Sequence, residues 1–250
     1  MKERHATKLF KNLRFYLKIF ILFVLILIFF FTSESIDLAA SRFFFSLGEK
    51  GLAFPHTKWM HYLFKLTPWP AILLGIFCFI LFVLSPFFKK LKMHRKTLLF
   101  LWLSFAMGPG FITHIVFKEF YGRPRPKHVI EFGGTENYRA FYDPGPTFKE
   151  KEHFRSFPCG HCTTGYYYFV FGFWLKKRHL FQLSRMVFLF SFLYGTAIGV
   201  LRMAQGGHFF SDVVAGGALM WFIAWGLYRI LYEKESSYPL TQDCDLVRGS

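Results

Sequence analysis

The sequence predicts an all-α integral membrane protein, a bundle of six transmembrane helices. Hydrophobic residues make up 53% of the 250 positions and aromatic residues 22%, including 37 Phe. Such a chain has too little polar surface to cover a water-soluble core of its size. Its apolar residues also fall in runs long enough to cross a hydrocarbon layer of roughly 30 Å.

Six apolar runs are predicted to cross the membrane, at residues 16–32, 71–88, 97–117, 163–175, 186–201 and 213–232. The fourth run is short, which local thinning of the bilayer or snorkelling of flanking residues would accommodate. The first follows a basic start, as a signal peptide does, and Leu38-Ala39-Ala40 resembles a weak cleavage site. Because that run is long and no clear soluble domain follows it, we expect an uncleaved anchor.

Between the first two runs, residues 33–70 mix aromatic side chains with single charges. This composition fits helices that lie at the level of the lipid headgroups. An apolar loop packed on the bundle fits the same composition, so both interpretations stay open at this point.

Basic residues indicate the orientation of the chain. Lys and Arg are dense before the first run, between the second and third, and between the fourth and fifth. These segments share one side, which the positive-inside rule assigns to the cytoplasm. We therefore expect a single domain over residues 1–250, with a basic cytoplasmic N-terminus at 1–15 and a cytoplasmic tail at 233–250. The last four residues, Val-Arg-Gly-Ser, resemble a cloning remnant.

One basic group breaks this trend, because it lies on the predicted outer side. It consists of Lys118, Arg123, Arg125 and Lys127. The net charge of +16 raises the question of a nucleic-acid partner. The basic residues flank apolar runs and form no stripe or aromatic-interleaved module, so we expect no nucleic acid. A charge group that violates the topological trend favours a functional explanation.

The chain has four cysteines. Cys78 sits in an apolar run and is interpreted as a buried small hydrophobic residue, while Cys244 lies in the polar tail. Cys159 and Cys162 form a C-x-x-C pair, which can bind metal or carry out redox chemistry. A zinc site needs about four ligands and no second pair lies nearby, so we expect no metal.

Three polar clusters lie on the predicted outer face. The first begins with Lys118 at the end of the third run and reaches Arg125. Pro124 and Pro126 cannot continue a helix interior, so the chain turns and Arg125 can come back toward Lys118. A planar guanidinium and a compact ammonium both suit phosphate oxygens. Contact with lipid headgroups is the plain alternative.

The second cluster, Ser-Phe-Pro-Cys-Gly-His at residues 156–161, precedes the fourth run. Pro and Gly favour a tight turn before a helix, whose free backbone N–H groups and dipole suit phosphate. Gly160 would allow close approach of the backbone, and His161 can carry a proton near neutral pH. A structural turn histidine is the alternative.

The third cluster joins the fifth and sixth runs and contains Arg202, His208 and Asp212. His208 and Asp212 are four residues apart, so they are expected to be neighbours on one helical face. The carboxylate can hold one ring nitrogen and raise the basicity of the other, as a nucleophilic histidine requires. A structural pair is the alternative, but ionisable groups at membrane depth usually serve function.

Together the clusters supply three cations, two histidines and one carboxylate, without a metal-binding carboxylate group. That set of groups suits metal-free phosphoryl transfer. A non-enzymatic lipid-phosphate binder or transporter would use the same cations. It would not need His208 and Asp212 at this spacing.

In order and spacing, the clusters resemble the signature of the type 2 phosphatidic acid phosphatase superfamily. Its K-x6-R-P motif matches residues 118–126, its P-S-G-H motif residues 158–161 and its S-R-x5-H-x3-D motif residues 201–212. The six apolar runs extend the resemblance to most of the chain. A soluble vanadate-dependent peroxidase shares these motifs, but the membrane runs argue against that class.

The resemblance implies a lipid phosphatase that needs neither metal nor other cofactor. His208 would form a phosphohistidine, Asp212 would orient it and His161 would protonate the leaving group. The expected phosphate-binding residues are Lys118, Arg125, Arg202, Cys159 and Gly160.

Two positions depart from the family pattern. Cys159 stands where Ser is usual, and a thiol is a weak hydrogen-bond donor. Leu201 stands where Ser is common before the Arg. Neither position holds the expected nucleophile or acid, so activity is expected to persist.

Members of the family act on lipid A, phosphatidylglycerophosphate, undecaprenyl diphosphate or phosphatidic acid, and some transfer the phosphate to another lipid. The segment at residues 127–155 is expected to cover the site. Its basic residues suit a polyanionic headgroup, which favours lipid A. The resemblance and topology together imply a bacterial cytoplasmic (inner) membrane protein with its active site on the periplasmic side. The oligomeric state is not predicted.

Overall fold

The computed structural model describes residues 2–48, 54, 57–143, 145 and 154–233. The described residues are mostly helical and form isolated β-bridges but no strand, which confirms the all-α prediction. The longer helices are α1 (Lys2–Ser46), α3 (Trp69–Leu84), α4 (Lys89–Phe105), η2 (Ala106–Phe117), α8 (Phe181–Ala204) and α9 (Phe210–Tyr228). The shorter ones are α2 (Lys58–Leu66), α5 (Lys118–Phe120), η3 (Pro126–His128), η4 (Ile130–Phe132), α6 (Gly160–Tyr166), α7 (Phe169–Lys177) and η5 (Arg229–Glu233).

Within the described residues, 5 helical runs are long and apolar enough to cross a membrane. They are Phe23–Ser46, Lys58–Leu84, Lys89–Phe120, Phe181–Ala204 and Phe210–Tyr232. The fourth predicted run, residues 163–175, is divided between α6 and α7 by a turn at Tyr167 and Tyr168, so neither helix alone has this length. The sixth crossing therefore stays a prediction.

The described residues between positions 33 and 70 are more regular than expected. Residues 33–46 continue α1, which corrects the predicted end of the first helix at residue 32. Ser33, Asp37 and Ser41 are buried along this extension at a four-residue spacing. That spacing places the three residues on one helical face. This part of α1 therefore packs against the rest of the protein through polar side chains. Residues 58–66 form the short helix α2.

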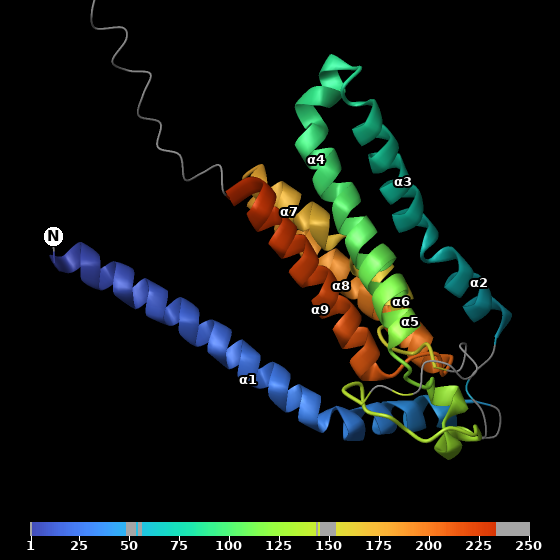
Figure 1. Cartoon of the computed structure of the whole chain (residues 1–250). Coiled ribbons are helices and arrows are strands. Elements are labelled where there is room, and N and C mark those ends of the chain that lie inside the picture. The colour runs from blue at the N-terminus through green and yellow to red at the C-terminus, as the bar shows by residue number, and fades with distance from the viewer. Residues whose placement is uncertain (1, 49–53, 55–56, 144, 146–153, 234–250) are drawn as a thin grey trace, which may run out of the picture.

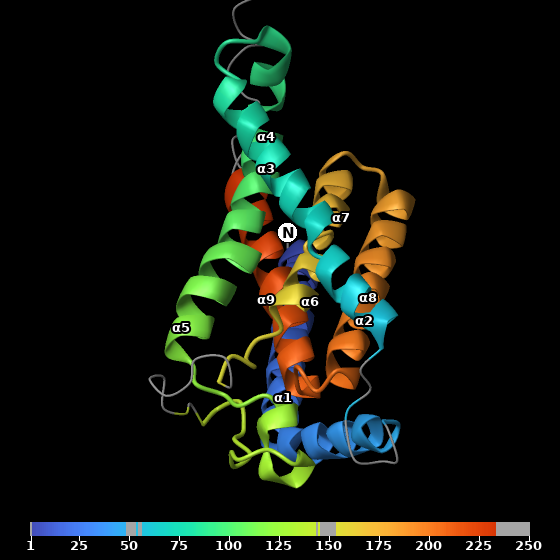
Figure 2. The same cartoon turned by 90° about the vertical axis from the view of Figure 1, so that its right-hand side faces the viewer.

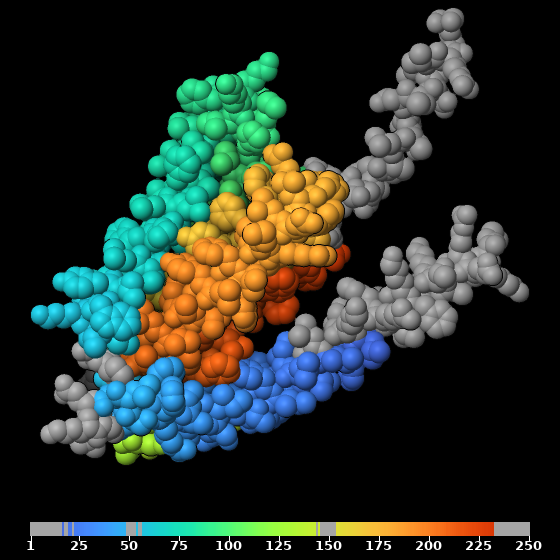
Figure 3. All heavy atoms as spheres, turned by 180° about the vertical axis from the view of Figure 1, so that it is seen from behind, coloured from blue at the N-terminus to red at the C-terminus, as the bar shows by residue number. Residues whose placement is uncertain are grey.

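The helices form a bundle with α1 at its side (Figure 1). Contacts join α3 to α4, α8 to both α6 and α7, and α9 to α6 (Figure 2). The N-terminal part of the α1 ribbon lies apart from the bundle (Figure 1), whereas the C-terminal part of α1 lies against α8 and α9 (Figure 3). Large apolar side chains such as Phe20, Phe31 and Phe87 are exposed, as expected of surfaces that face lipid.

Small residues allow the central helices to approach closely. A Cβ atom added to Gly165 in α6 would lie 2.8 Å from Gly195 Cα in α8. This backbone contact excludes any larger residue at Gly165, and small residues at such positions are typical of packed membrane helices. Ser191 Oγ in α8 donates a hydrogen bond to Tyr166 O in the same region, at 3.1 Å.

The two ends of the bundle differ in character. The α3–α4 connection and the α7–α8 turn lie at one end (Figure 1). The long connection at 121–159, of which residues 121–143, 145 and 154–159 are described, lies at the other end together with α2 and the C-terminal part of α1. The three polar clusters gather at this second end, as the sequence predicts.

Candidate active site

The second and third clusters meet at the start of α9. Ser156 Oγ donates a hydrogen bond to Asp212 Oδ2 at 2.5 Å, and Cys159 N donates to the backbone O of Asp212 at 3.1 Å. Asp212 Oδ2 also accepts the backbone N–H of Phe209 at 2.9 Å. Asp212 lies in the first helical turn, so its carboxylate caps the turn as well as facing the site. The carboxylate is thereby fixed from two segments of the chain.

His208 is buried, and its Nδ1 lies 3.5 Å from Asp212 Oδ2. This distance is long for a hydrogen bond. The expected placement on a helical face is wrong, because His208 precedes α9 in non-helical chain. The first turn of α9 brings Asp212 back over the histidine instead. Burial lowers the pKa of His208 well below its usual value although Asp212 opposes this, so the imidazole is neutral and can act as a nucleophile.

Arg202 and Arg125 line a cavity of about 560 Å³. The Arg202 guanidinium lies over the ring of Phe64 in α2, 4.3 Å from its centroid, and Nη1 donates to Gln205 Oε1 at 2.6 Å. A Cβ atom on Gly207 would lie 2.4 Å from Arg202 Nη2, so only glycine leaves room for the guanidinium. The two arginines therefore meet in one cavity, as the sequence predicts.

Side chains that the sequence did not single out for the site also line this cavity. Its lining consists of Thr57, Lys58, His61, Tyr62, Phe64, Arg125, Lys127, Arg202, Gln205 and Gly207. It contains four cationic side chains and no carboxylate among these residues. The contribution of α2 was missed because a short amphipathic segment gives no signal of where it packs. The cavity is suited to a ligand with more than one negative charge.

His161 is the second residue of α6 and precedes the apolar run. Its ring centroid lies 4.3 Å from that of Phe64, so the Phe64 ring contacts both His161 and Arg202. Burial, together with the positive charges of Arg202 and Lys118, lowers the pKa of His161 to about 3. His161 is therefore neutral until a negative charge enters the site.

Lys118 takes a different position from the two arginines. Its Nζ donates to the backbone O of Arg155 at 2.5 Å, and Lys118 does not line the cavity. Its charge nevertheless acts on both His161 and His208. Lys118 is thus close to the site without facing the same cavity as Arg125 and Arg202.

Cys159 and Cys162 are joined by a disulfide bond, so Cys159 presents no thiol hydrogen to a ligand. The expectation of a weak thiol donor at this position is therefore wrong. Cys159 is the N-cap of α6, and its sulfur accepts the N–H of Cys162 at 3.3 Å. Gly160 begins α6, and a Cβ atom there would approach His114 Nε2 to 3.3 Å. Among the described residues no group of three His, Cys, Asp or Glu side chains is placed to hold a metal.

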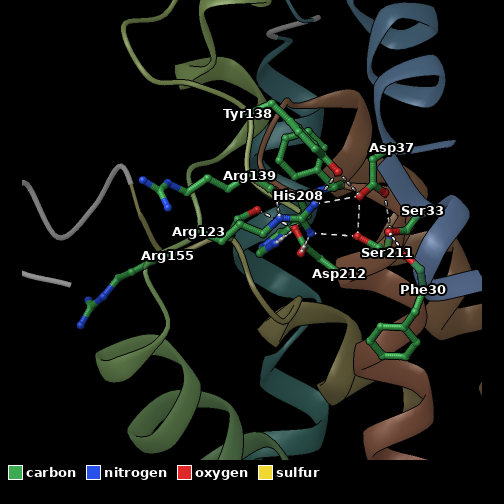
Figure 4. Close-up of polar contacts among 12 residues, drawn as sticks. Phe30, Ser33, Asp37, Arg123, Tyr138, Arg139, Arg155, His208, Ser211 and Asp212 are labelled. Atoms are coloured by element: carbon green, nitrogen blue, oxygen red, sulfur yellow. Dashed lines mark hydrogen bonds and ion pairs between the residues drawn. The ribbon is translucent and has the colours of Figure 1, made fainter. Parts of the chain in front are cut away.

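Arg123, which the sequence places only in a basic group outside the three motifs, is a further candidate for function. It is fully buried and makes ion pairs with Asp212 and Asp37 (Figure 4). The two carboxylates outweigh the effect of burial and raise the pKa of Arg123 above its usual value. An acidic residue at the end of an apolar run is a signal for function, and Asp37 could have been found in this way.

Comparisons with known proteins agree with the three motifs. The family model of the PAP2 superfamily matches residues 98–236. A lipid A 4′-phosphatase of Francisella tularensis subsp. novicida is 35% identical over 158 residues, which cover 62% of this chain and 68% of that protein. A lipid A 1-phosphatase of Rhizobium etli is 31% identical over 144 residues, covering 54% and 55%.

A lipid A 1-phosphatase of Rhizobium johnstonii is 30% identical over 143 residues, which cover 54% of this chain and 52% of that protein. The chain thus spans about half the length of the two Rhizobium relatives. No solved structure matches. The family model covers more than half of the chain and contains all three motifs, so the chain belongs to the PAP2 superfamily.

Proposed function

We propose that this chain removes a phosphate group from lipid A through a phosphohistidine formed on His208. Family membership and the three lipid A phosphatase relatives support the broader statement that the chain is a phosphatase acting on lipid phosphates. The observation that carries the mechanism is the buried pair of His208 and Asp212, on which the charges of Lys118 and of Arg202 in the neighbouring cavity act.

In the first step the lone pair of neutral His208 Nε2 attacks phosphorus, and the bond from phosphorus to the lipid oxygen breaks. His161 gives a proton to the departing oxygen. Because the ligand-free pKa of His161 is low, the incoming phosphate supplies the negative charge that allows this proton to be held. Asp212 stabilises the positive charge that develops on His208.

In the second step water attacks the phosphohistidine, and His161 takes its proton. Inorganic phosphate leaves, and His208 returns to its neutral form. The phosphate is held by Arg125 and Arg202 in the cavity, with Lys118 nearby. The backbone of Gly160 at the start of α6 completes the proposed set. Cys159, the N-cap of that helix, holds this turn in place, because its sulfur lies in a disulfide and its N–H donates to Asp212 O.

Lipid A is favoured as the substrate on two grounds. The relatives are named for removing phosphate from the 1 position or from the 4′ position of lipid A. The headgroup of lipid A can therefore carry more than one phosphate. The cavity has Lys58 and Lys127 in addition to the two arginines, more positive charge than one phosphate monoester balances.

A second cavity suits the hydrocarbon part of such a lipid. It measures about 430 Å³ and lies between α1 and α9, where Phe29, Phe30 and Val214 contribute apolar surface. Ser211, next to Asp212, and Pro158, three residues before His161, also line it. An acyl chain in this cavity would keep the phosphorylated headgroup near His208.

The whole chain is proposed to act as one integral domain of the bacterial cytoplasmic membrane, with its site on the periplasmic face. The basic start of α4 and the α7–α8 turn lie at the end opposite the site, as the positive-inside rule expects for that orientation (Figure 1). The disulfide between Cys159 and Cys162 suits the oxidising periplasm.

The test is phosphate release from lipid A by the full chain purified in detergent, with EDTA present. Wild-type protein is expected to release phosphate, and His208→Ala to lose at least about 1,000-fold in rate. His94→Ala, a substitution at the opposite end of the bundle, is the matched control. Activity that survives His208→Ala would refute the phosphohistidine, and activity that stops with EDTA would refute metal independence.

A further inference from the structure

A buried arginine bridges two carboxylates from distant parts of the chain. Arg123 Nη1 lies 2.5 Å from Asp212 Oδ1, and Nη2 lies 2.8 Å from Asp37 Oδ2. All three side chains are fully buried. Figure 4 shows the guanidinium between Asp37 on α1 and Asp212 on α9. A buried pair is costly unless its geometry is good, so this arrangement is a specific one.

Asp37 also fixes the beginning of α9. Its Oδ1 accepts the backbone N–H of Ser211 at 2.7 Å, and its Oδ2 accepts the Ser211 hydroxyl at 2.6 Å. Ser211 Oγ in turn accepts a hydrogen bond from Arg123 Nη1 at 2.8 Å. Ser211 immediately precedes Asp212, so these bonds set the position of the turn from which the Asp212 carboxylate projects.

The remaining contacts hold the guanidinium in one orientation. Arg123 Nε donates to the backbone O of Arg139 at 2.9 Å, and the ring of Phe209 lies against the guanidinium, with its centroid 4.4 Å away. Tyr138 Oη donates to Asp37 Oδ2 at 3.2 Å. All three nitrogens of the Arg123 guanidinium therefore donate hydrogen bonds in a fixed geometry. The single ammonium nitrogen of a lysine could not reproduce this geometry.

The two oxygens of Asp212 face different partners. Oδ1 binds Arg123, whereas Oδ2 lies toward His208 and accepts from Ser156 and Phe209. One guanidinium between two carboxylates leaves one net negative charge next to His208. Without Asp37, the charge of Arg123 would cancel that of Asp212.

We propose that Arg123 and Asp37 are positioning residues, which together orient Asp212 toward His208 and keep the negative charge that a phosphorylated His208 needs. This inference rests on the proposed roles of His208 and Asp212. It assigns α1 a part in the reaction, and Asp37 lies outside the segment at 98–236 that the family model matches. Neither residue lines the 560 Å³ cavity, so both act behind His208 and not on the substrate.

The test compares kcat and KM of the full chain in detergent, with lipid A as substrate. Asp37→Asn is expected to lower kcat by about 10-fold to 100-fold, as for other partners that orient a catalytic group, and to change KM by less than about 3-fold. Arg123→Lys is expected to retain more kcat than Arg123→Ala, because it keeps the charge. Asp143→Asn, which alters an exposed ion pair with Arg139, is the matched control and is expected to leave kcat unchanged.

The pH profile separates positioning from a purely structural role. The groups that face His208 are Asp212 from α9, Lys118 from α5 and Arg202 from α8, and they stay the same in these variants. Asp37→Asn removes a negative charge, so the acidic limb of kcat that reports protonation of His208 should move to lower pH. Arg123→Ala removes a positive charge, so the limb should move to higher pH. Asp37→Glu keeps the charge and should leave the limb in place.

A wild-type kcat in Asp37→Asn, or limbs that move in the same direction in both variants, would overturn the inference. Failure of the proposed function looks different, because His208→Ala would then keep its activity. Should Asp37→Asn not fold, the comparison of Asp37→Glu with Arg123→Lys and Arg123→Ala still decides the question. In Asp212→Asn, an added Asp37→Asn substitution should lower kcat little further, since the residues act as one unit.

Discussion

Ser156 and Asp212 are 56 positions apart, yet the Ser156 hydroxyl donates to Asp212 Oδ2 at 2.5 Å. Both side chains are buried. Ser156 lies just before the second motif, and Asp212 is the last residue of the third. The hydrogen bond therefore joins the second and third clusters at the oxygen that faces His208, and its loss is predicted to affect catalysis.

Ser156→Ala is expected to lower kcat by about 10-fold to 100-fold, since a hydrogen bond to a charged group contributes roughly 1.5–3 kcal/mol. KM for lipid A should change little, because Ser156 does not line the cavity with Arg125 and Arg202. Steady-state phosphate release measures both constants. Ser191→Ala is the control, because it removes a buried hydroxyl whose bond to Tyr166 O lies in the helix packing. Equal effects of the two substitutions would contradict the prediction.

Lys58→Ala and Lys127→Ala are each expected to raise KM for lipid A by about 2-fold to 5-fold, with kcat unchanged. Both residues line the cavity and are exposed to solvent, where one charge pair contributes about 0.5–1 kcal/mol. The increase should shrink at high salt because the interaction is screened. It should also be smaller for lipid A with a single phosphate.

Kinetics of both lipids at low and high salt measure these effects. Lys92→Ala, at the opposite end of the bundle, is the matched control. A fall in kcat without a change in KM would show that Lys58 and Lys127 do not contribute to binding the headgroup.

His161 and His208 are predicted to be neutral at pH 6 in the ligand-free protein. Burial lowers the pKa of both, His161 to about 3, and a lowered histidine pKa means that the proton binds only at more acidic pH. Nitrogen NMR of labelled histidine measures the charge, and His161→Gln and His208→Gln assign the signals. Added inorganic phosphate should charge His161, because a bound anion offsets Arg202 and Lys118. An imidazolium signal for either residue at pH 6 without phosphate would disprove the prediction.

Cys159→Ser is expected to retain or raise turnover. The Ser hydroxyl can accept the Cys162 N–H as the Cys159 sulfur does, and it restores a hydrogen-bond donor at the start of α6. Loss of so short a disulfide loop should cost about 2 kcal/mol of stability and lower Tm by several degrees. Phosphate release and thermal unfolding measure the two effects. A large loss of activity at a temperature where the variant is folded would contradict the prediction.

Much of the site follows from local chemistry along the chain. The prolines after Lys118 force a turn, and Gly160 and His161 stand at the start of a helix. His208 and Asp212 are close because only three residues separate them, although His208 lies before the helix and not on its face. Such features depend on neighbours a few residues away, so residue order is enough to predict them. The helix break between α6 and α7 was not predicted, because an apolar run looks the same whether or not a turn at Tyr167 divides it.

By itself, then, the sequence determined the helical membrane fold, the three motifs and the end of the bundle where they gather. Apolar run length and motif spacing are properties of the chain alone. Only the tertiary structure decided that Arg123 joins Asp37 to Asp212, that Ser156 reaches Asp212 and that α2 lines the cavity. These partners lie tens of residues apart and share no period, so the folded packing alone brings their charges together.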